Sequence, residues 1–140
     1  MTDRELLEMA AKAAGWTWWQ SKHGYWKIQG PGCEERAACC GWRKFDAYTG
    51  SNLAEPTPAD ALLEVGFDPL NDDGDALRLA VKLRLDVMFG FDDEENVVSV
   101  NANWDGAPAE VIQEILGEDV AEATRCAIVR AAAEIGRAMK

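Results

Sequence analysis

The chain has 140 residues, of which 48% are hydrophobic and 28% charged, and its formal net charge is -11. This composition is typical of a folded globular protein and excludes a disordered chain. The length suits a single domain over residues 1–140, with a core that needs neither a metal ion nor a disulfide. No apolar run reaches the roughly 20 residues of a membrane span, so we expect a soluble protein of the bacterial host cytoplasm.

Four cysteines and one histidine are the residues to test for metal or thiol chemistry. Cys33, Cys39, Cys40 and Cys126 lack the paired spacing of zinc ligands, and adjacent Cys39 and Cys40 fit a disulfide framework poorly. A thiol site would need His23 to activate Cys39 or Cys40, and no spacing links them. We therefore expect no metal site, no cofactor and no catalytic residue, and hence a protein that is not an enzyme.

The first half of the chain predicts a helix followed by a hairpin. Thr2 and Glu5 have the spacing of a capping box, and apolar residues then recur at helical intervals. Residues 16–20 and 25–29 are rich in aromatic residues and favour two strands. Residues 30–64 are an irregular, insertion-like region in which we expect only short helical segments, at 34–40 and at 59–65.

The second half begins with a longer helix. Acidic residues from Asp72 to Asp75 suit a helix start, where carboxylates accept hydrogen bonds from backbone N–H groups. Leu77 and Val81 widen the apolar stripe of this helix, so we expect other elements to cover it.

A second hairpin and two more helices complete the prediction. Residues 86–91 and 98–103 alternate apolar and polar side chains, as half-buried strands do. Pro108 begins an additional helix over about 107–116, and a last helix begins near Asp119. The fold class expected is α+β, with a small, mostly antiparallel sheet of three or four strands from two hairpins, sandwiched by helices.

Three segments resemble the phage ABA sandwich domain family, a family of small phage and prophage proteins. They are residues 68–83 (DPLNDDGDALRLAVKL), 123–137 (ATRCAIVRAAAEIGR) and 5–15 (ELLEMAAKAAG). The resemblance implies a small sheet packed between helical layers and brings no catalytic residues. Residues 30–64 and 107–116 depart from the family pattern as additional material, and added loops are frequent sites of binding.

Charge is the first pointer to a binding surface. Residues 51–123 hold three basic residues against eighteen acidic ones. Such a field repels nucleic acids and membrane surfaces and attracts a basic partner; the alternative is that it only increases solubility. The acidic run Asp92, Asp93, Glu94 and Glu95 falls in a predicted turn, where it is open to a partner.

Aromatic residues are the second pointer. Trp18 and Trp19 point to opposite faces of a strand, so either one is exposed or helices cover both faces. Trp42 and Arg43 follow in the irregular region. An exposed Trp near Arg is typical of interface anchors, so Trp18, Trp42 and Arg43 join the acidic run as candidate binding residues.

The leading hypothesis is a phage-encoded accessory protein that binds and inhibits a host macromolecule. An anti-defence role fits best, against a CRISPR effector or nuclease, by steric and electrostatic blocking. The partner expected is a host protein that normally binds nucleic acid, with no direct binding to nucleic acid or membrane. The alternatives are a binder of a nucleotide signal, using the aromatic hairpin with Arg43 and Lys44, and an oligomeric structural phage protein.

Overall fold

The computed structural model of the chain describes residues 1–20, 26–30, 46–49 and 57–139. These residues form the α+β fold that the sequence predicts. In chain order the elements are α1 (Asp3–Ala13), β1 (Thr17–Gln20), β2 (Trp26–Gln29), β3 (Asp46–Thr49), α2 (Pro58–Glu64), α3 (Asp73–Lys82), β4 (Leu85–Asp92), β5 (Glu95–Ala102), β6 (Ile112–Ile115) and α4 (Val120–Ala138).

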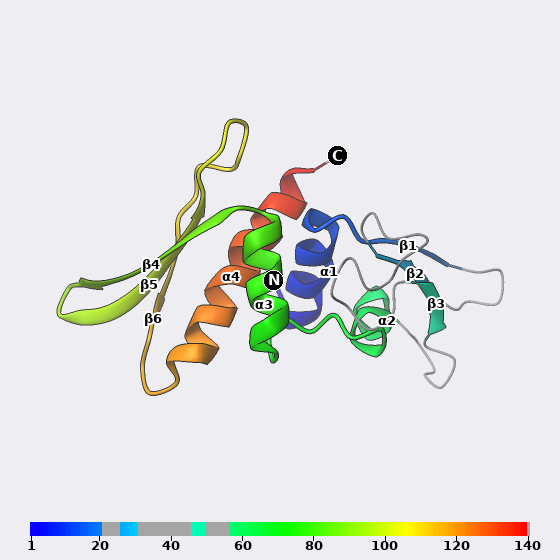
Figure 1. Cartoon of the computed structure of the whole chain (residues 1–140), viewed down its shortest axis with the longest axis horizontal. Coiled ribbons are helices and arrows are strands. Elements are labelled where there is room, and N and C mark those ends of the chain that lie inside the picture. Colours follow the sequence, from blue (N-terminus) through cyan, green and yellow to red (C-terminus); the bar gives the residue numbers. More distant parts are fainter. Residues whose placement is uncertain (21–25, 31–45, 50–56, 140) are drawn as a thin grey trace.

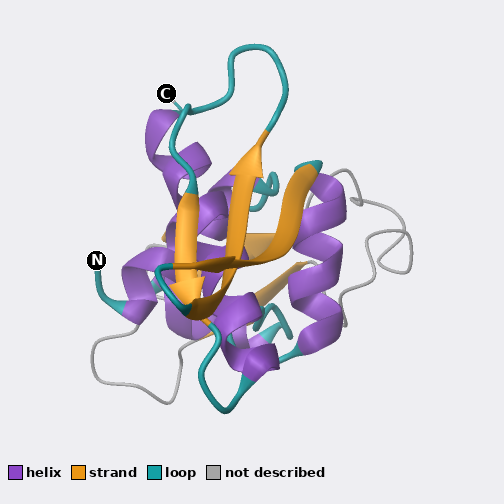
Figure 2. Ribbon diagram, turned by 90° about the vertical axis from the view of Figure 1, so that its left-hand side faces the viewer, coloured by secondary structure: helices purple, strands orange, loops and turns teal. Residues whose placement is uncertain are grey.

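The helices occupy the middle of the molecule, with a small sheet on either side of them (Figure 1). One antiparallel sheet has the order β1-β2-β3 and the other the order β4-β5-β6. Figure 2, viewed from the side of the second sheet, shows its three strands in front of the helices. The two predicted hairpins therefore belong to separate sheets. Each hairpin has one apolar face, and the two faces pack on opposite sides of the central helices.

One cluster of buried residues connects both sheets with the four described helices. Ile28 of β2, Leu62 of α2 and Phe67 are fully buried on one side, and Val98 and Val100 of β5 on the other. The sheets share this core through the helices between them.

The closest helix packing is between α1 and α4, which are rich in alanine. Gly136 of α4 lies against the backbone of Met9 in α1. One turn further along α1, Lys12 Nζ donates a hydrogen bond of 3.1 Å to the carbonyl oxygen of Met139. Small side chains let the two backbones approach closely, so these two helices form the centre of the molecule.

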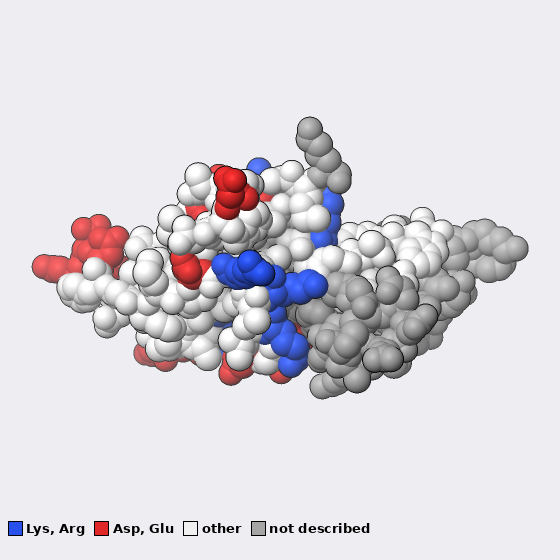
Figure 3. Space-filling view, turned by 45° about the horizontal axis from the view of Figure 1, so that its top comes forward, with Lys and Arg blue, Asp and Glu red and all other residues white. Residues whose placement is uncertain are grey.

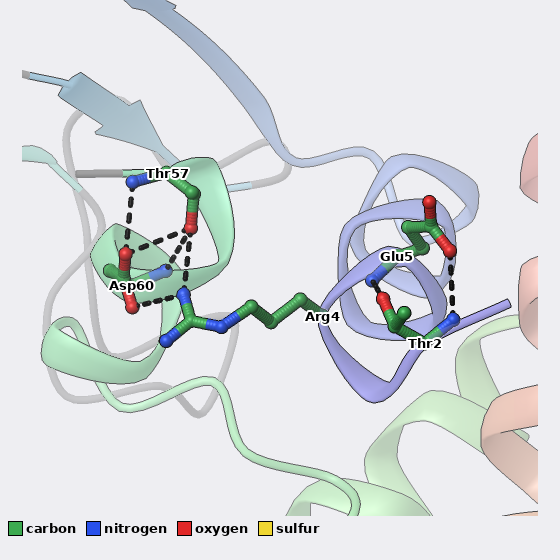
Figure 4. A network of polar contacts seen from close by, with 5 residues as sticks. All are labelled: Thr2, Arg4, Glu5, Thr57 and Asp60. Carbon is green, nitrogen blue, oxygen red and sulfur yellow. Dashed lines mark hydrogen bonds and ion pairs between the residues drawn. The ribbon is translucent and has the colours of Figure 1, made fainter. Parts of the chain in front are cut away.

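The predicted capping box of the first helix is confirmed. Thr2 N donates to Glu5 Oε2 at 2.7 Å, and Glu5 N donates to Thr2 Oγ1 at 3.2 Å. A second capping box, at Thr57 and Asp60, begins α2. Arg4 extends from α1 and donates to Thr57 Oγ1 at 3.0 Å and to the Asp60 carboxylate, which ties the two helix starts together (Figure 4).

The helix starts expected further along the chain are also confirmed. Asp72 caps α3 by accepting a hydrogen bond of 2.9 Å from Asp75 N. Asp119 caps α4 by accepting one of 2.9 Å from Glu122 N.

The additional helix predicted over 107–116 is wrong. Residues 112–115 form β6, and Ile112 pairs with Val100 while Ile115 pairs with Val97 of β5. Ile112 is buried, whereas Ile115, three residues later and on the opposite face, is 60% exposed. The free edge of β5 offers backbone hydrogen-bond donors and acceptors to residues 112–115, and pairing with it is more favourable than forming a short helix.

Two further predictions concern residues 21–64. The short helix expected at 59–65 is confirmed as α2, whereas β3 was not expected in this region. The expected turn at 21–24 and helix at 34–40 lie outside the described residues. None of the described helices is long and apolar enough to cross a membrane.

Candidate interaction surface

The acidic run lies at the tip of the β4–β5 hairpin. Asp92 pairs with Glu95, and Asp93 and Glu94 form the turn with φ angles of 48° and 68°. Two consecutive positive φ values are characteristic of a type I′ turn, which joins two strands directly. We name these four residues the acidic tip.

All four side chains of the acidic tip are exposed, and none has an ion-pair partner within the described part of the chain. Figure 3 shows red atoms gathered at the far left, the end at which Figure 1 places this turn. Four carboxylates therefore project from the body of the molecule on a paired hairpin.

An open apolar groove of about 500 Å³ lies between β4 and the helices α3 and α4. The strand contributes Val87 and Phe89 to its lining, α3 contributes Ala76 and Leu77, and α4 contributes Ile128. Phe89 is three residues from Asp92, so at the strand rise of about 3.3 Å per residue the groove ends roughly 10 Å from the acidic tip.

Several large apolar side chains in and beside this groove are exposed to solvent. Leu77 and Val81 on α3 are 65% and 68% exposed. Phe89 and Phe91 on β4 are 60% and 69% exposed, although they share the strand face on which Val87 packs against the core. The expectation that other elements cover α3 is therefore wrong for this side of the helix, within the residues that the structure describes.

The predicted tryptophan anchor is on the other sheet. Trp18 is half-buried and packs against the core, so it is not the exposed tryptophan of the strand. Trp19, on the opposite face, is 45% exposed. Trp42 and Arg43 lie outside the described residues. Of the candidate residues Trp18, Trp42 and Arg43, the structure describes Trp18 alone, and it lies on the other sheet from the acidic tip.

Two basic residues precede β4, at the opposite end of the strand from the acidic tip: Lys82 ends α3, and Arg84 lies in the turn between α3 and β4. Lys82 and Arg84 are exposed, and neither has an ion-pair partner among the described residues. Arg84 has a φ of 52°, in the left-handed region, where the chain turns from α3 into β4. Strand β4 thus runs from a basic end to an acidic end.

Cys126 is the one cysteine within the described residues. Its Sγ donates to Glu114 Oε1 at 3.7 Å, and Glu114 is also paired with Arg130. Burial and the nearby Glu114 carboxylate raise the pKa of the Cys126 thiol, which disfavours the thiolate that nucleophilic chemistry requires.

Metal ligation has no candidate in the described part of the chain, where no three His, Cys, Asp or Glu side chains are grouped to hold an ion. His23, Cys33, Cys39 and Cys40 lie outside it.

Four exposed apolar residues were not selected from the sequence as binding candidates: Leu77, Val81, Phe89 and Phe91. Their spacing matched the apolar faces of a helix and a strand, which usually are buried. The width of the apolar stripe of α3 could have indicated them. The stripe is wider than packing against one neighbouring helix requires, so part of it is left for another contact.

A comparison of the chain with protein-family models, with curated proteins and with solved structures found no match. The resemblance to the phage ABA sandwich family thus stays a prediction.

Proposed function

We propose that this chain is a binding protein that blocks a basic surface of another protein, as a phage accessory protein would block a host nuclease or CRISPR effector. The observation that carries the proposal is the acidic tip. It presents four carboxylates on an ordered hairpin in a chain of net charge -11.

A protein surface that grips nucleic acid is built from Lys and Arg that bind phosphates. The same side chains attract the carboxylates of the acidic tip, and their electrostatic attraction speeds the encounter and weakens with salt. Four carboxylates on one turn match a surface of several basic side chains, which supports a protein partner in preference to a small ligand.

The test is an affinity pull-down of the tagged chain from a bacterial host lysate, washed at low and then at high salt. The key variant carries Asp93→Asn, Glu94→Gly and Glu95→Gln, which removes three charges and keeps residues that suit a type I′ turn. We expect the wild-type chain to retain a nucleic-acid-binding protein at low salt and the variant to lose it.

The matched control neutralises three exposed carboxylates elsewhere, with Asp105→Asn, Glu110→Gln and Glu118→Gln. It has the same net charge as the hairpin variant, and we expect it to keep the partner. If both variants lose the partner protein equally, only the net charge of the chain matters for binding. If both retain it equally, the acidic tip does not take part in the interaction.

A further inference from the structure

Strand β4 has an open edge. Within the described residues it pairs with β5 alone, so the opposite edge of Leu85–Asp92 has no neighbouring strand. Exposed edges readily pair with another strand, and proteins usually protect them with charges, prolines or a covering element. The edge strand β4 carries the exposed Phe89 and Phe91 together with Asp86, a charge that a pairing strand must accommodate.

The residues from Arg84 to Asp92 are complementary to themselves when the strand is reversed. An antiparallel pairing centred on Met88 places Asp92 opposite Arg84, the turn residue that directly precedes β4. On the face toward the helices, it places Val87 opposite Phe89. Cross-strand neighbours of this kind lie about 4.5–5.5 Å apart, within contact distance.

The remaining pairs of this register also match. Leu85 lies opposite Phe91, so each apolar residue of that face meets another apolar residue. On the other face Asp86 lies opposite Gly90, which has no side chain; a Cβ atom added at Gly90 would meet nothing within 4 Å. No like charges stand opposite each other.

We propose that the occupant of this edge is a second copy of the chain. The two β4 strands pair antiparallel about a two-fold axis at Met88, and the two sheets join into one sheet of six strands. The isologous contact buries the exposed phenylalanines and forms the ion pair between Arg84 and Asp92 twice. This inference does not rest on the proposed function, because it concerns the protein alone.

The apolar groove supports the same occupant. Phe89 and Phe91 lie beyond the part of β4 that packs against the core, on the side of the sheet where the helices lie. A two-fold axis at Met88 brings the start of the second β4, where its α3 ends, toward these two residues. The exposed Leu77 and Val81 of that second α3 can then pack against Phe89 and Phe91 of the first copy.

The experiment measures the molar mass of the full chain in solution at low salt, by sedimentation velocity or light scattering. We expect twice the 15.4 kDa of one chain for the wild type. Arg84→Asp alone places Asp opposite Asp92, and Asp92→Arg alone places Arg opposite Arg84, so each variant should have the mass of one chain.

Mixing the two variants in equal amounts is the decisive step. In the mixed pair Asp at 84 faces Arg at 92, and the original Asp92 faces the original Arg84, so every pair is again complementary. We expect the mixture to regain twice the mass of one chain. A misfolded variant could not be rescued in this way. Asp105→Arg, with the same charge change as Asp92→Arg but in the loop after β5, should stay dimeric.

Three results would overturn the proposal. A wild-type chain of 15.4 kDa at low salt and at every concentration shows that the edge does not self-associate. Single variants that remain dimeric show that the copies meet elsewhere. A mixture that stays monomeric while the wild type is dimeric excludes this register.

Discussion

Gly136 is the position at which the structure and the properties of an isolated helix predict opposite results. It lies in the last turns of α4, where Ala is more favourable than Gly by about 1 kcal/mol in a helix interior. A Cβ atom on Gly136 would lie 1.9 Å from the Met9 carbonyl oxygen and 2.8 Å from its carbonyl carbon. Both atoms are backbone, so no side-chain rotation relieves the clash.

Gly136→Ala therefore requires α1 and α4 to move apart by about 1 Å, and overpacking of this kind costs roughly 1–3 kcal/mol. Because the better helix propensity of Ala offsets about 1 kcal/mol of this cost, we expect a net loss of up to about 2 kcal/mol in the free energy of unfolding. Urea unfolding followed by circular dichroism measures the loss as a lower midpoint.

Gly90→Ala is the control, because a Cβ atom there meets nothing within 4 Å. It should change the free energy of unfolding by less than about 0.5 kcal/mol, as is usual for surface substitutions. A higher midpoint for Gly136→Ala than for the wild type would show that the two helices are not in close contact at this point.

Three other variants test particular contacts. Asp93→Asn with Glu94→Gly should raise the free energy of unfolding by about 1 kcal/mol, since both positions have positive φ; a lower urea midpoint would argue against the type I′ turn. Asp75→Ala should lower it by about 1–3 kcal/mol, because the buried Asp75 carboxylate accepts a hydrogen bond of 2.9 Å from Asp68 N; an unchanged midpoint would contradict this. Burial, and then the Glu5 carboxylate, raises the pKa of Glu8 above 4.5, so ionised Glu8 destabilises the fold. Glu8→Gln should thus be more stable than the wild type at neutral pH. This advantage should shrink as the pH falls through the raised pKa and vanish below 4.5, and a constant difference between the two chains across this range would refute it.

The helices were predictable because their signals are local. Thr2, Asp72 and Asp119 mark three helix starts by the chemistry of the side chain that accepts the first hydrogen bonds, and all three are the observed caps. Aromatic content predicted the strands of the first hairpin, and alternation predicted those of the second.

The sheets were less predictable because strand pairing depends on residues far apart in the chain. The apolar spacing of residues 111–115 fits one face of a helix as well as it fits a strand. These residues form a strand because the edge of β5 is available for pairing, and Ile112 pairs with Val100 there. In the same way, β3 was missed because its pairing with β2 is not encoded within Asp46–Thr49 itself.

The candidate surface was predictable only in part. The acidic tip could be predicted, since a charged run between two alternating segments is a turn. The exposure of Phe89 and Phe91 could not, because alternation shows which face a residue occupies but not whether a helix reaches that far along the strand.

The contact between α1 and α4 has a consequence for the synthesis of the protein. Lys12 and Met139 are 127 residues apart, and at about 5–20 residues per second a ribosome needs roughly 6–25 s to make the chain between them. During this time Leu7, Ala10 and Ala11 on the buried face of α1 have no α4 to cover them. The nascent chain therefore presents an apolar helix for many seconds, and it is in this interval, before the last helix leaves the ribosome, that chaperones would matter most for its yield.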